Sequence, residues 1–271
     1  MTPLPEPETF LSGEHGEVGG RRGALRRAGD RALDAWLRAS GALRAIEMAA
    51  ERTRPREVLL ASVYRAAGTA LEAALPSLES SRHHVEQRLG STDELGGGKF
   101  ENLNELIGDA RPDWLLVVDD DVVLPARFLD RLLAIAEAFD LALAQPAQSL
   151  ASHAAWRVTR RRPRSILRET RFVEIGPVTL FRRDAADELL PFPALRYGWG
   201  LDLAWAATAL ERGWRLGIAD ALPVRHESAA VGSAYPADAA IAEAREFLAA
   251  RPYLSSAAAQ ETIATHRRLP R

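Results

Sequence analysis

The stretch DWLLVVDDDVVLP, residues 113–125, places four apolar residues directly before three consecutive carboxylates. An unbroken run of Leu and Val is typical of a strand that is buried on both faces of a sheet. Three adjacent negative charges repel one another, and an unpaired charge is costly to bury. The run therefore predicts a strand over 114–118 whose carboxyl end carries Asp119, Asp120 and Asp121 and needs a cation nearby.

Segments with the apolar patterns of strands and helices alternate around this stretch. The expected strands are 58–63, 85–89 and 141–145, and the expected helices are 68–80, 102–109 and 126–139. Such alternation predicts an α/β fold with a mainly parallel central sheet flanked by helices. Ligands of these sheets bind beyond the carboxyl ends of the strands, where the three aspartates fall.

The second half of the chain has a less regular pattern. We expect a strand with a break at Gly176-Pro177, two helices and two short late strands: 173–181, 201–211, 237–251, 216–219 and 224–226. Residues 149–171 contain seven arginines and are interpreted as a mobile, solvated loop. The alternative is that the arginines of 157–171 bind a phosphate or another anion, because guanidinium groups suit phosphate geometry.

The N-terminal region differs from the rest of the chain. Residues 1–23 are acidic and rich in Gly and Pro, which predicts a flexible tail without the apolar segment of a signal peptide. Residues 24–54 show helical spacing with an interruption near Gly41 and an arginine-rich outer face. This predicts a helical extension that packs on the main domain or on a second subunit, forming a homo-oligomer. Peripheral membrane contact is the alternative, weakened by the acids that dilute the positive face: Asp30, Asp34, Glu47 and Glu51.

Composition narrows the classes of protein. A chain of 271 residues with 47% hydrophobic content can bury a substantial core. The net charge of −2 gives no general reason to expect nucleic acid as a partner. Without cysteine there is no disulfide and no thiolate ligand, so a metal would have to be held by oxygen and imidazole. No run approaches the ~20 apolar residues of a transmembrane segment, and a soluble cytoplasmic protein is expected.

Four motifs occur in a characteristic order: SVYR (62–65), GGGKFENLN (96–104), VVDDDV (117–122) and EIGPVTLFRR (174–183). Together they resemble the GT-A glycosyltransferases, particularly the family 2-like group, over residues 56–226. The resemblance implies the GT-A fold and transfer of a sugar from a nucleoside-diphosphate sugar to an acceptor hydroxyl. It also implies that Asp119 lies on the nucleotide side and that Asp121 binds Mn²⁺ or Mg²⁺ on the sugar diphosphate, with Asp120 as the variable middle position.

The resemblance also suggests residues along the nucleotide pocket. Lys99 is the only lysine of the chain and stands in a G-K-x-x-x-L-N pattern, although a lone lysine is more often a surface charge. Ser62 and Tyr64 end the first strand, and Tyr64 would stack on the base. The family's usual Asn is absent from this strand end, so the nucleotide stays unidentified.

The segment YGWGLDLAW, residues 197–205, points to the acceptor side. Two glycines around Trp199 predict a tight turn that approaches something closely. Asp202 opens the next helix, where a carboxylate can simply serve as a cap. The W-G-x-D arrangement resembles the acceptor-side motif of inverting GT-A enzymes. This implies that Asp202 is the catalytic base and that Trp199 forms a wall for the acceptor or packs beneath it.

His226 stands at the end of a predicted short strand. A single histidine in this setting is usually structural or exposed. The resemblance implies instead that it completes the metal site, and neutral imidazole suits Mn²⁺ beside carboxylates.

These readings divide the chain into five parts: a tail (1–23), a helical extension (24–54), a nucleotide-sugar-binding half (55–150), an acceptor-binding and catalytic half (151–235) and a C-terminal helical region (236–271). Two rival functions make different demands on the sequence. A Mg²⁺-dependent nucleotidyltransferase would need a Gly-rich basic turn after the first strand, which SVYRAAGTAL does not match. A non-catalytic sugar-nucleotide-binding protein of the same fold would not need the complete set of Asp119, Asp121, Asp202 and His226.

Overall fold

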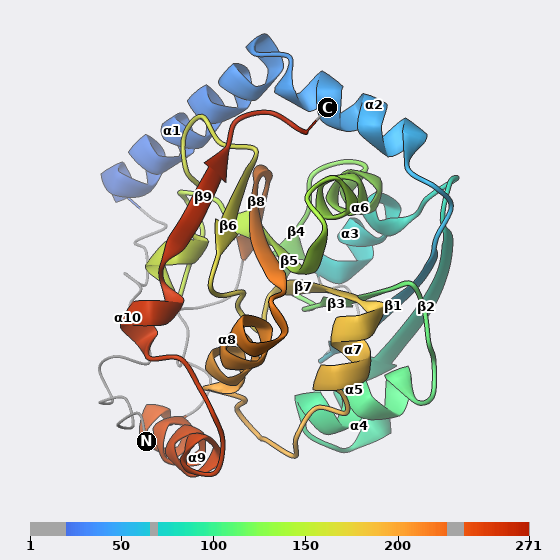
Figure 1. Cartoon of the computed structure of the whole chain (residues 1–271), viewed down its shortest axis with the longest axis vertical. Helices are drawn as coiled ribbons and strands as arrows, with labels where there is room; N and C mark the ends of the chain where they lie inside the picture. Colours follow the sequence, from blue (N-terminus) through green and yellow to red (C-terminus); the bar gives the residue numbers. More distant parts are fainter. Residues whose placement is uncertain (1–19, 66–69, 227–235, 271) are drawn as a thin grey trace.

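The computed structural model describes residues 20–65, 70–226 and 236–270. A nine-stranded sheet crosses its centre, with helices on both faces (Figure 1). The strands are β1 (Glu57–Tyr64), β2 (His84–Ser91), β3 (Trp114–Val118), β4 (Val122–Val123), β5 (Leu141–Gln148), β6 (Leu167–Thr170), β7 (Val178–Arg182), β8 (Arg215–His226) and β9 (Thr262–His266). The α-helices are α1 (Gly20–Ala39), α2 (Ala42–Arg52), α3 (Ala70–Leu78), α4 (Thr92–Leu95), α5 (Lys99–Ile107), α6 (Phe128–Ala138), α7 (Arg183–Leu189), α8 (Leu201–Arg212), α9 (Ala237–Ala249) and α10 (Ser256–Ala259).

The sheet is mixed, with strand order β2-β1-β3-β7-β5-β8-β6-β9 and β4 paired to β8 off this path. The pairs β1–β2, β1–β3 and β5–β8 are parallel. β7 and β6 run antiparallel to their neighbours and therefore opposite to the other six strands of the path. The predicted α/β class and mainly parallel sheet are confirmed. Because β7 lies between β3 and β5, the two predicted halves share one sheet; their division of labour stays a prediction.

Alternate residues of the central strands enter two separate cores, which explains the unbroken apolar run. Leu116 and Val118 of β3 pack with α2, α3 and α6 on one face. Leu115 and Val117 pack with α5, α7 and α8 on the other face. All four side chains are at most 4% exposed. A strand covered on both faces has no polar side, so its sequence cannot alternate.

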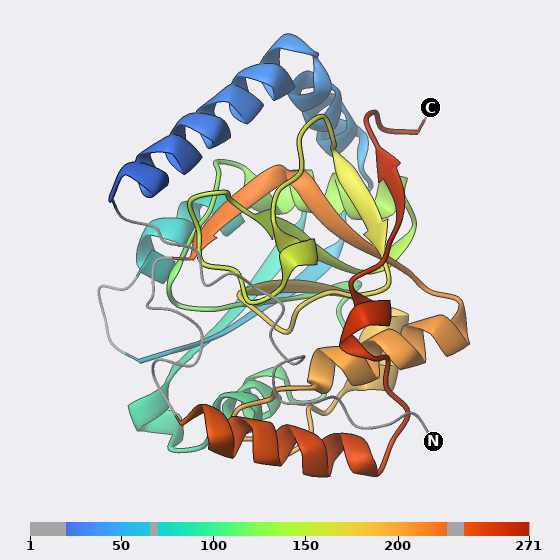
Figure 2. The ribbon, with the colours of Figure 1, turned by 90° about the vertical axis from the view of Figure 1, so that its left-hand side faces the viewer.

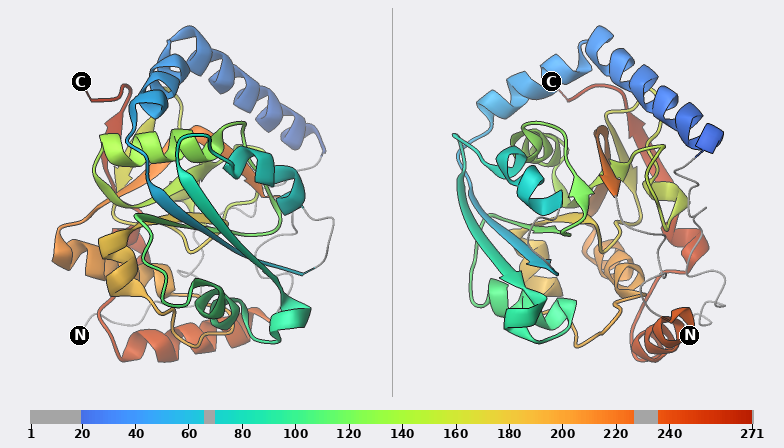
Figure 3. Two further views of the ribbon diagram at one scale, coloured as in Figure 1. Left: turned by 90° about the vertical axis from the view of Figure 1, so that its right-hand side faces the viewer. Right: turned by 180° about the vertical axis from the view of Figure 1, so that it is seen from behind.

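The helical extension lies along one edge of the molecule (Figure 2; Figure 3). α1 and α2 meet at Gly41, whose φ of 73° is in the left-handed region, so the predicted interruption is confirmed. Residues 20–23, assigned to the tail, already belong to α1; the rest of the predicted tail, 1–19, lies outside the described residues. None of the helices within the described ranges is both long and apolar enough to cross a bilayer.

The interpretation of residues 149–171 as a mobile, solvated loop is wrong. Arg161 and Arg168 are only 3% and 1% exposed. Arg168 makes a two-point ion pair with Asp220 of β8, with Nε–Oδ2 and Nη2–Oδ1 distances of 2.8 and 3.0 Å. Arg161 donates to Asp34 of α1 at 2.6 Å. These buried ion pairs connect the arginine-rich segment to α1 and β8. They also occupy the guanidinium groups of Arg161 and Arg168, so neither is available to bind a diphosphate.

Three other boundaries differ from expectation. The two late short strands form one strand, β8, because it continues past a register shift beside β5. The expected strand 173–181 begins only at Val178, after the Gly-Pro break. The helix expected from residue 102 begins at Lys99. The Gly98 N–H donates to Glu101 Oε2 at 2.9 Å, and the side-chain amide of Asn102 accepts from the N–H of Gly97 and donates to its carbonyl, so the chain is fixed just before the first helical turn. Lys99 therefore projects from a defined first helical turn.

Candidate active site

The carboxyl end of β3 gathers three potential metal ligands. Single ligand atoms of Asp119, Asp121 and His226 all lie within 4.8 Å of one another. The His226 Nε2 to Asp121 Oδ1 distance is 2.8 Å. Two carboxylates and an imidazole form a donor set that suits Mn²⁺ or Mg²⁺. The structure thus brings together the residues predicted as metal ligands, together with Asp119 of the predicted nucleotide side.

A short pair of strands explains why positions so far apart in the chain meet. Val122 of β4 pairs antiparallel with His226, the last residue of β8. Asp121 directly precedes β4, so this pairing sets its carboxylate beside the imidazole. The backbone N–H of His226 donates to Ser152 Oγ at 2.9 Å, which holds the strand end in place. The site is therefore built on paired backbone rather than on free loops.

The charges at the site compensate one another. Lys99 Nζ donates to Asp119 Oδ1 at 2.6 Å, and both side chains are partly buried. Burial opposes the charged imidazolium, yet the hydrogen bond and charge of Asp121, with the charge of Asp119, raise the pKa of His226 above its ordinary value. The only lysine of the chain thus supplies part of the positive charge that the aspartates need. A metal competing for His226 would have to displace its proton.

Gly176 forms one wall of this cluster. A Cβ placed there would lie 2.9 Å from Asp119 Oδ2 and 3.6 Å from Lys99 Nζ. Any side chain would press on the Lys99–Asp119 pair. The break in EIGPVTLFRR therefore lets the backbone approach the carboxylate closely, a role that glycine alone fills without strain.

Asp202 lies in the first turn of α8, but it is not the N-terminal cap. Gly200 occupies that position with φ of 85°, and Asp202 Oδ1 accepts from the Leu203 N–H at 2.9 Å. Asp202 is 4% exposed. Burial raises its pKa to about 7, against the lowering effect of backbone hydrogen bonds. A carboxyl group with such a pKa can accept and release a proton near neutrality.

Glu174 is a site residue that the sequence analysis did not single out. Its Oε2 is buried without a hydrogen-bond partner among the described residues. Burial, and next the charge of Asp202, raise the pKa of Glu174 well above its ordinary value; the charges of Asp119 and Lys99 also act on it. The charges of the metal cluster and of Asp202 therefore both reach Glu174. The sequence signal that could have pointed to Glu174 is its position two residues before the glycine of the EIGPVTLFRR motif.

Glu243 of α9 was also missed. Its carboxylate accepts from the backbone N–H groups of Arg196, Tyr197 and Gly198, at 2.6, 2.9 and 3.0 Å. These three residues lead into the turn that aims Asp202. No local pattern signals this role, because the partners lie more than 40 positions apart in the chain.

Gly198 should be sensitive to the smallest substitution. Its φ is 74°, and a Cβ would lie 2.1 Å from the Phe100 ring. Gly198→Ala should lower the free energy of unfolding by ~1–3 kcal/mol beyond the backbone strain, because overpacking adds to it. Gly213→Ala is the matched control, since its φ is 67° and nothing lies within 4 Å. Chemical denaturation of both variants measures the difference; equal losses would contradict the close approach to Phe100.

Four predicted residues have other surroundings. Ser62 is fully buried and donates to the Val118 carbonyl at 2.7 Å, so its hydroxyl joins β1 to β3 and is not offered to a ligand. Asp120 Oδ2 accepts from the Arg65 N–H at 2.9 Å, outside the metal cluster. Trp199 is 9% exposed and packs in the core against α9, which favours packing beneath the acceptor over a stacking wall. Tyr64 is partly buried at the end of β1 against the core, and its contact with a base stays a prediction.

Comparisons with known proteins place these features in a family. The sequence model of "Glycosyltransferase like family 2" matches residues 35–246, a range that contains all the site residues described above. No curated protein sequence matches the chain.

Solved structures of similar shape include A197 from STIV, with a TM-score of 0.40, 14% identity, and coverage of 63% of this chain and 85% of that one. GalNAc-T7 with UDP, GalNAc and Mn²⁺ has a TM-score of 0.45 and 10% identity, and S. aureus TarS 1–349 has 0.38 and 11%. These two alignments cover 67% and 60% of this chain, but only 45% and 58% of the GalNAc-T7 and TarS chains.

Proposed function

The chain belongs to the glycosyltransferase-like family 2 and is a glycosyltransferase, and we propose that it transfers a sugar, with inversion, from a nucleoside-diphosphate sugar to an acceptor hydroxyl in a metal-dependent reaction. The observation that carries this proposal is the convergence of Asp119, Asp121 and His226 at the carboxyl edge of the sheet. A second acidic centre, Asp202, belongs to a different element and contributes no atom to that cluster. Two separate centres suit a reaction with two substrates.

The first centre would hold the donor. Asp121 and His226, with Asp119 beside them, would bind Mn²⁺ or Mg²⁺, and the bound ion would neutralise charge on the departing nucleoside diphosphate. Lys99 pairs with Asp119 at the rim of this cluster. Because an ammonium group has three N–H donors, Lys99 would still have donors for a phosphate or ribose oxygen of the bound sugar nucleotide. Gly176 lets the backbone approach this pair without a side chain that would displace it.

The second centre would act on the acceptor. Asp202 would take the proton of the acceptor hydroxyl as that oxygen attacks the anomeric carbon from the face opposite the leaving group. The turn that positions it is fixed by Glu243 and by the contact of Gly198 with Phe100. A rigid turn suits a base that has to meet a hydroxyl within hydrogen-bonding distance. Burial, and next the charge of Asp202, raise the pKa of Glu174, so Glu174 adds no second negative charge beside the base.

Donor binding should depend on both the metal and Asp121. UDP or GDP with Mn²⁺ should stabilise the fold by about 2.7 kcal/mol at a hundredfold excess over Kd, and neither should do so with EDTA. Asp121→Asn should abolish this stabilisation, because it removes a charged ligand while keeping the side-chain shape. Thermal unfolding with and without nucleotide measures the effect.

Asp120→Asn is the matched control for that experiment. It removes one charge from the adjacent position, and the amide oxygen can still accept from Arg65 N–H. This variant should retain most of the metal-dependent stabilisation. Undiminished stabilisation of Asp121→Asn would contradict the metal site, and stabilisation by nucleoside triphosphates alone would favour a nucleotidyltransferase.

A further inference from the structure

The outer surface of α1 and α2 is strongly basic. Within residues 20–54 the exposed ionisable side chains comprise eight arginines and one acid, Glu51. Helical spacing places Arg27, Arg31 and Arg38 along one line of α1. Arg267 and Arg268 are exposed in the C-terminal segment that runs beside α2 (Figure 1). The protein as a whole carries a charge of −2, so this positive charge is a local property.

Most of the acidic residues expected to offset the positive charge of this face contact other parts of the protein instead. Asp30 accepts from the backbone N–H groups of Leu150 and Ala151, at 3.0 and 3.1 Å. Asp34 pairs with Arg161, and Glu47 with Arg131. Three of the four acids that weaken a membrane-facing reading in sequence are therefore turned toward the body of the protein. Of these four acids only Glu51 is classed as exposed.

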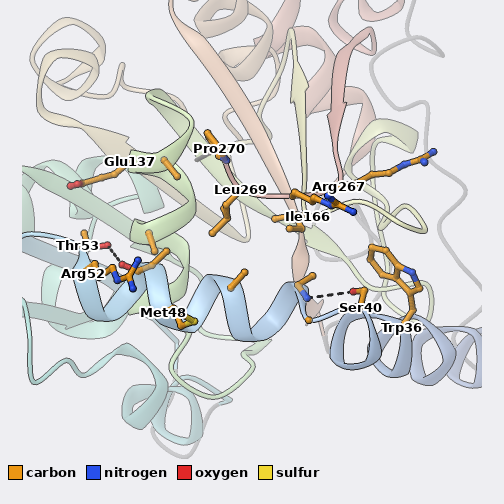
Figure 4. A pocket seen from close by; sticks show the side chains of 17 residues that line it. Trp36, Ser40, Met48, Arg52, Thr53, Glu137, Ile166, Arg267, Leu269 and Pro270 are labelled. Carbon is orange, nitrogen blue, oxygen red and sulfur yellow. Dashed lines mark hydrogen bonds between the residues drawn. The ribbon is translucent and has the colours of Figure 1, made fainter.

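A groove opens within the same surface. It has a volume of about 940 Å³ and lies between α2, α6 and the C-terminal segment (Figure 4). Its apolar lining includes Trp36, Met48, Ile166 and Leu269. Its charged lining comprises Arg52, Arg267 and Arg268 together with one acid, Glu137, which pairs with Arg56. None of these three arginines has an ion-pair partner within residues 20–65, 70–226 and 236–270. The groove joins apolar walls to unneutralised positive charge.

We propose that this basic face, formed by α1, α2 and residues 267–270, docks the protein on the surface of an anionic phospholipid bilayer. The arginines contact the lipid headgroups, and the groove receives an acyl chain. Charge complementarity supplies attraction to the anionic leaflet, and apolar burial supplies the rest. This inference goes beyond sugar transfer and does not depend on the roles of Asp202 or the metal ligands.

The same surface suits other partners less well. Exposed apolar side chains, Leu25 at 73% and Met48 at 42%, lie on the two helices that carry the arginines. A nucleic-acid duplex would engage the arginines but leave these side chains and the groove unused. A symmetric dimer through this face would bring two basic surfaces together, and like charges across an interface are unfavourable. A bilayer with anionic headgroups satisfies both the charge and the apolar surface.

Vesicle sedimentation of the full-length protein tests the proposal. The protein should bind vesicles that contain phosphatidylglycerol, should not bind pure phosphatidylcholine, and should bind less as salt rises. Each arginine at an anionic surface contributes roughly a factor of five, so Arg52→Gln/Arg267→Gln/Arg268→Gln should weaken binding about 100-fold. Met48→Ser should weaken it several-fold and should do so at high salt as well.

A triple variant with the same net charge is the control. Arg111, Arg183 and Arg212 are exposed and paired with Asp187, Asp113 and Glu188. Replacing these three arginines by Gln should leave vesicle binding unchanged. Equal weakening by both triple variants, or no binding to phosphatidylglycerol, would overturn the proposal. Tighter binding to an oligonucleotide, or a solution dimer that dissociates in the first triple variant, would overturn it in favour of those partners.

Discussion

Asp202→Asn should lower turnover by ~10²–10⁴-fold, the usual contribution of a general base. Donor affinity should stay unchanged, because Asp202 is not part of the cluster of Asp119, Asp121 and His226. Release of the nucleoside diphosphate from the sugar donor measures turnover with any hydroxyl acceptor, including water. Calorimetric titration of UDP or GDP with Mn²⁺ measures donor affinity.

Asp238→Asn is a closely matched control. Asp238 is the second residue after the cap of α9, as Asp202 is in α8, but it is exposed. The Asp238→Asn variant therefore removes an acid from the equivalent helical position but leaves the buried candidate site unchanged. Full activity of Asp202→Asn would exclude it as the base. Equal losses in the two variants would show that the helix end, and not the proton acceptor, is responsible.

The pH dependence of Asp202 gives a second readout. Because burial raises its pKa to about 7, wild-type turnover should fall as the pH drops below 7, when the carboxylate becomes protonated. The contribution of Asp202 to the free energy of unfolding changes in the opposite direction, since it falls as the pH rises. A raised pKa favours the fold fully below the ordinary value of 3.8, and this advantage is lost as the pH rises through about 7. At higher pH Asp202→Asn should therefore be at least as stable as the wild type, whereas the loss of a purely structural carboxylate would lower stability.

Arg168→Met should destabilise the protein by about 3–5 kcal/mol, because removing one partner of a buried ion pair leaves the other charge uncompensated. Asp220 is 1% exposed, and its carboxylate also accepts from the Arg162 N–H at 2.8 Å. Arg168 additionally donates to the carbonyls of Val158 and Arg160, at 2.6 and 2.8 Å. The substitution therefore releases the segment between β5 and β6 as well as the charge. Urea denaturation measures the loss.

Two further variants separate the causes. Arg168→Met/Asp220→Asn should recover part of the loss, because the amide keeps an acceptor for Arg162 without a buried charge. Arg212→Met, which removes the exposed pair with Glu188, should leave stability unchanged. Trypsin should cut after Arg160 or Arg161 in Arg168→Met before it does so in the wild type. If Arg168→Met is as stable as Arg212→Met, the pair is not the anchor of this segment.

The sequence by itself determined the features that arise from local patterns. The unbroken run of 114–118 required burial on both faces, and its residues enter two separate cores. The order of motifs around Lys99, Asp119 and Asp202 indicated the family that matches residues 35–246. Gly41 marked the break between α1 and α2 because a left-handed residue cannot continue a helix. Apolar periodicity, glycine positions and the order of motifs can be recognised in the sequence alone, because they do not depend on which distant residues are brought together by folding.

Tertiary structure decided which charges are buried and which residues meet. Seven arginines in one segment look solvated until Asp220 and α1 supply partners for Arg168 and Arg161. Glu174 and Glu243 gained their places through contacts with distant parts of the chain, as did the inward Asp30 and Asp34. The cost of burying a charge depends on its neighbours, and neighbours from other strands and helices are absent from any local pattern. For the same reason Ser62 and Asp120, which share motifs with other predicted site residues, are held by backbone groups instead.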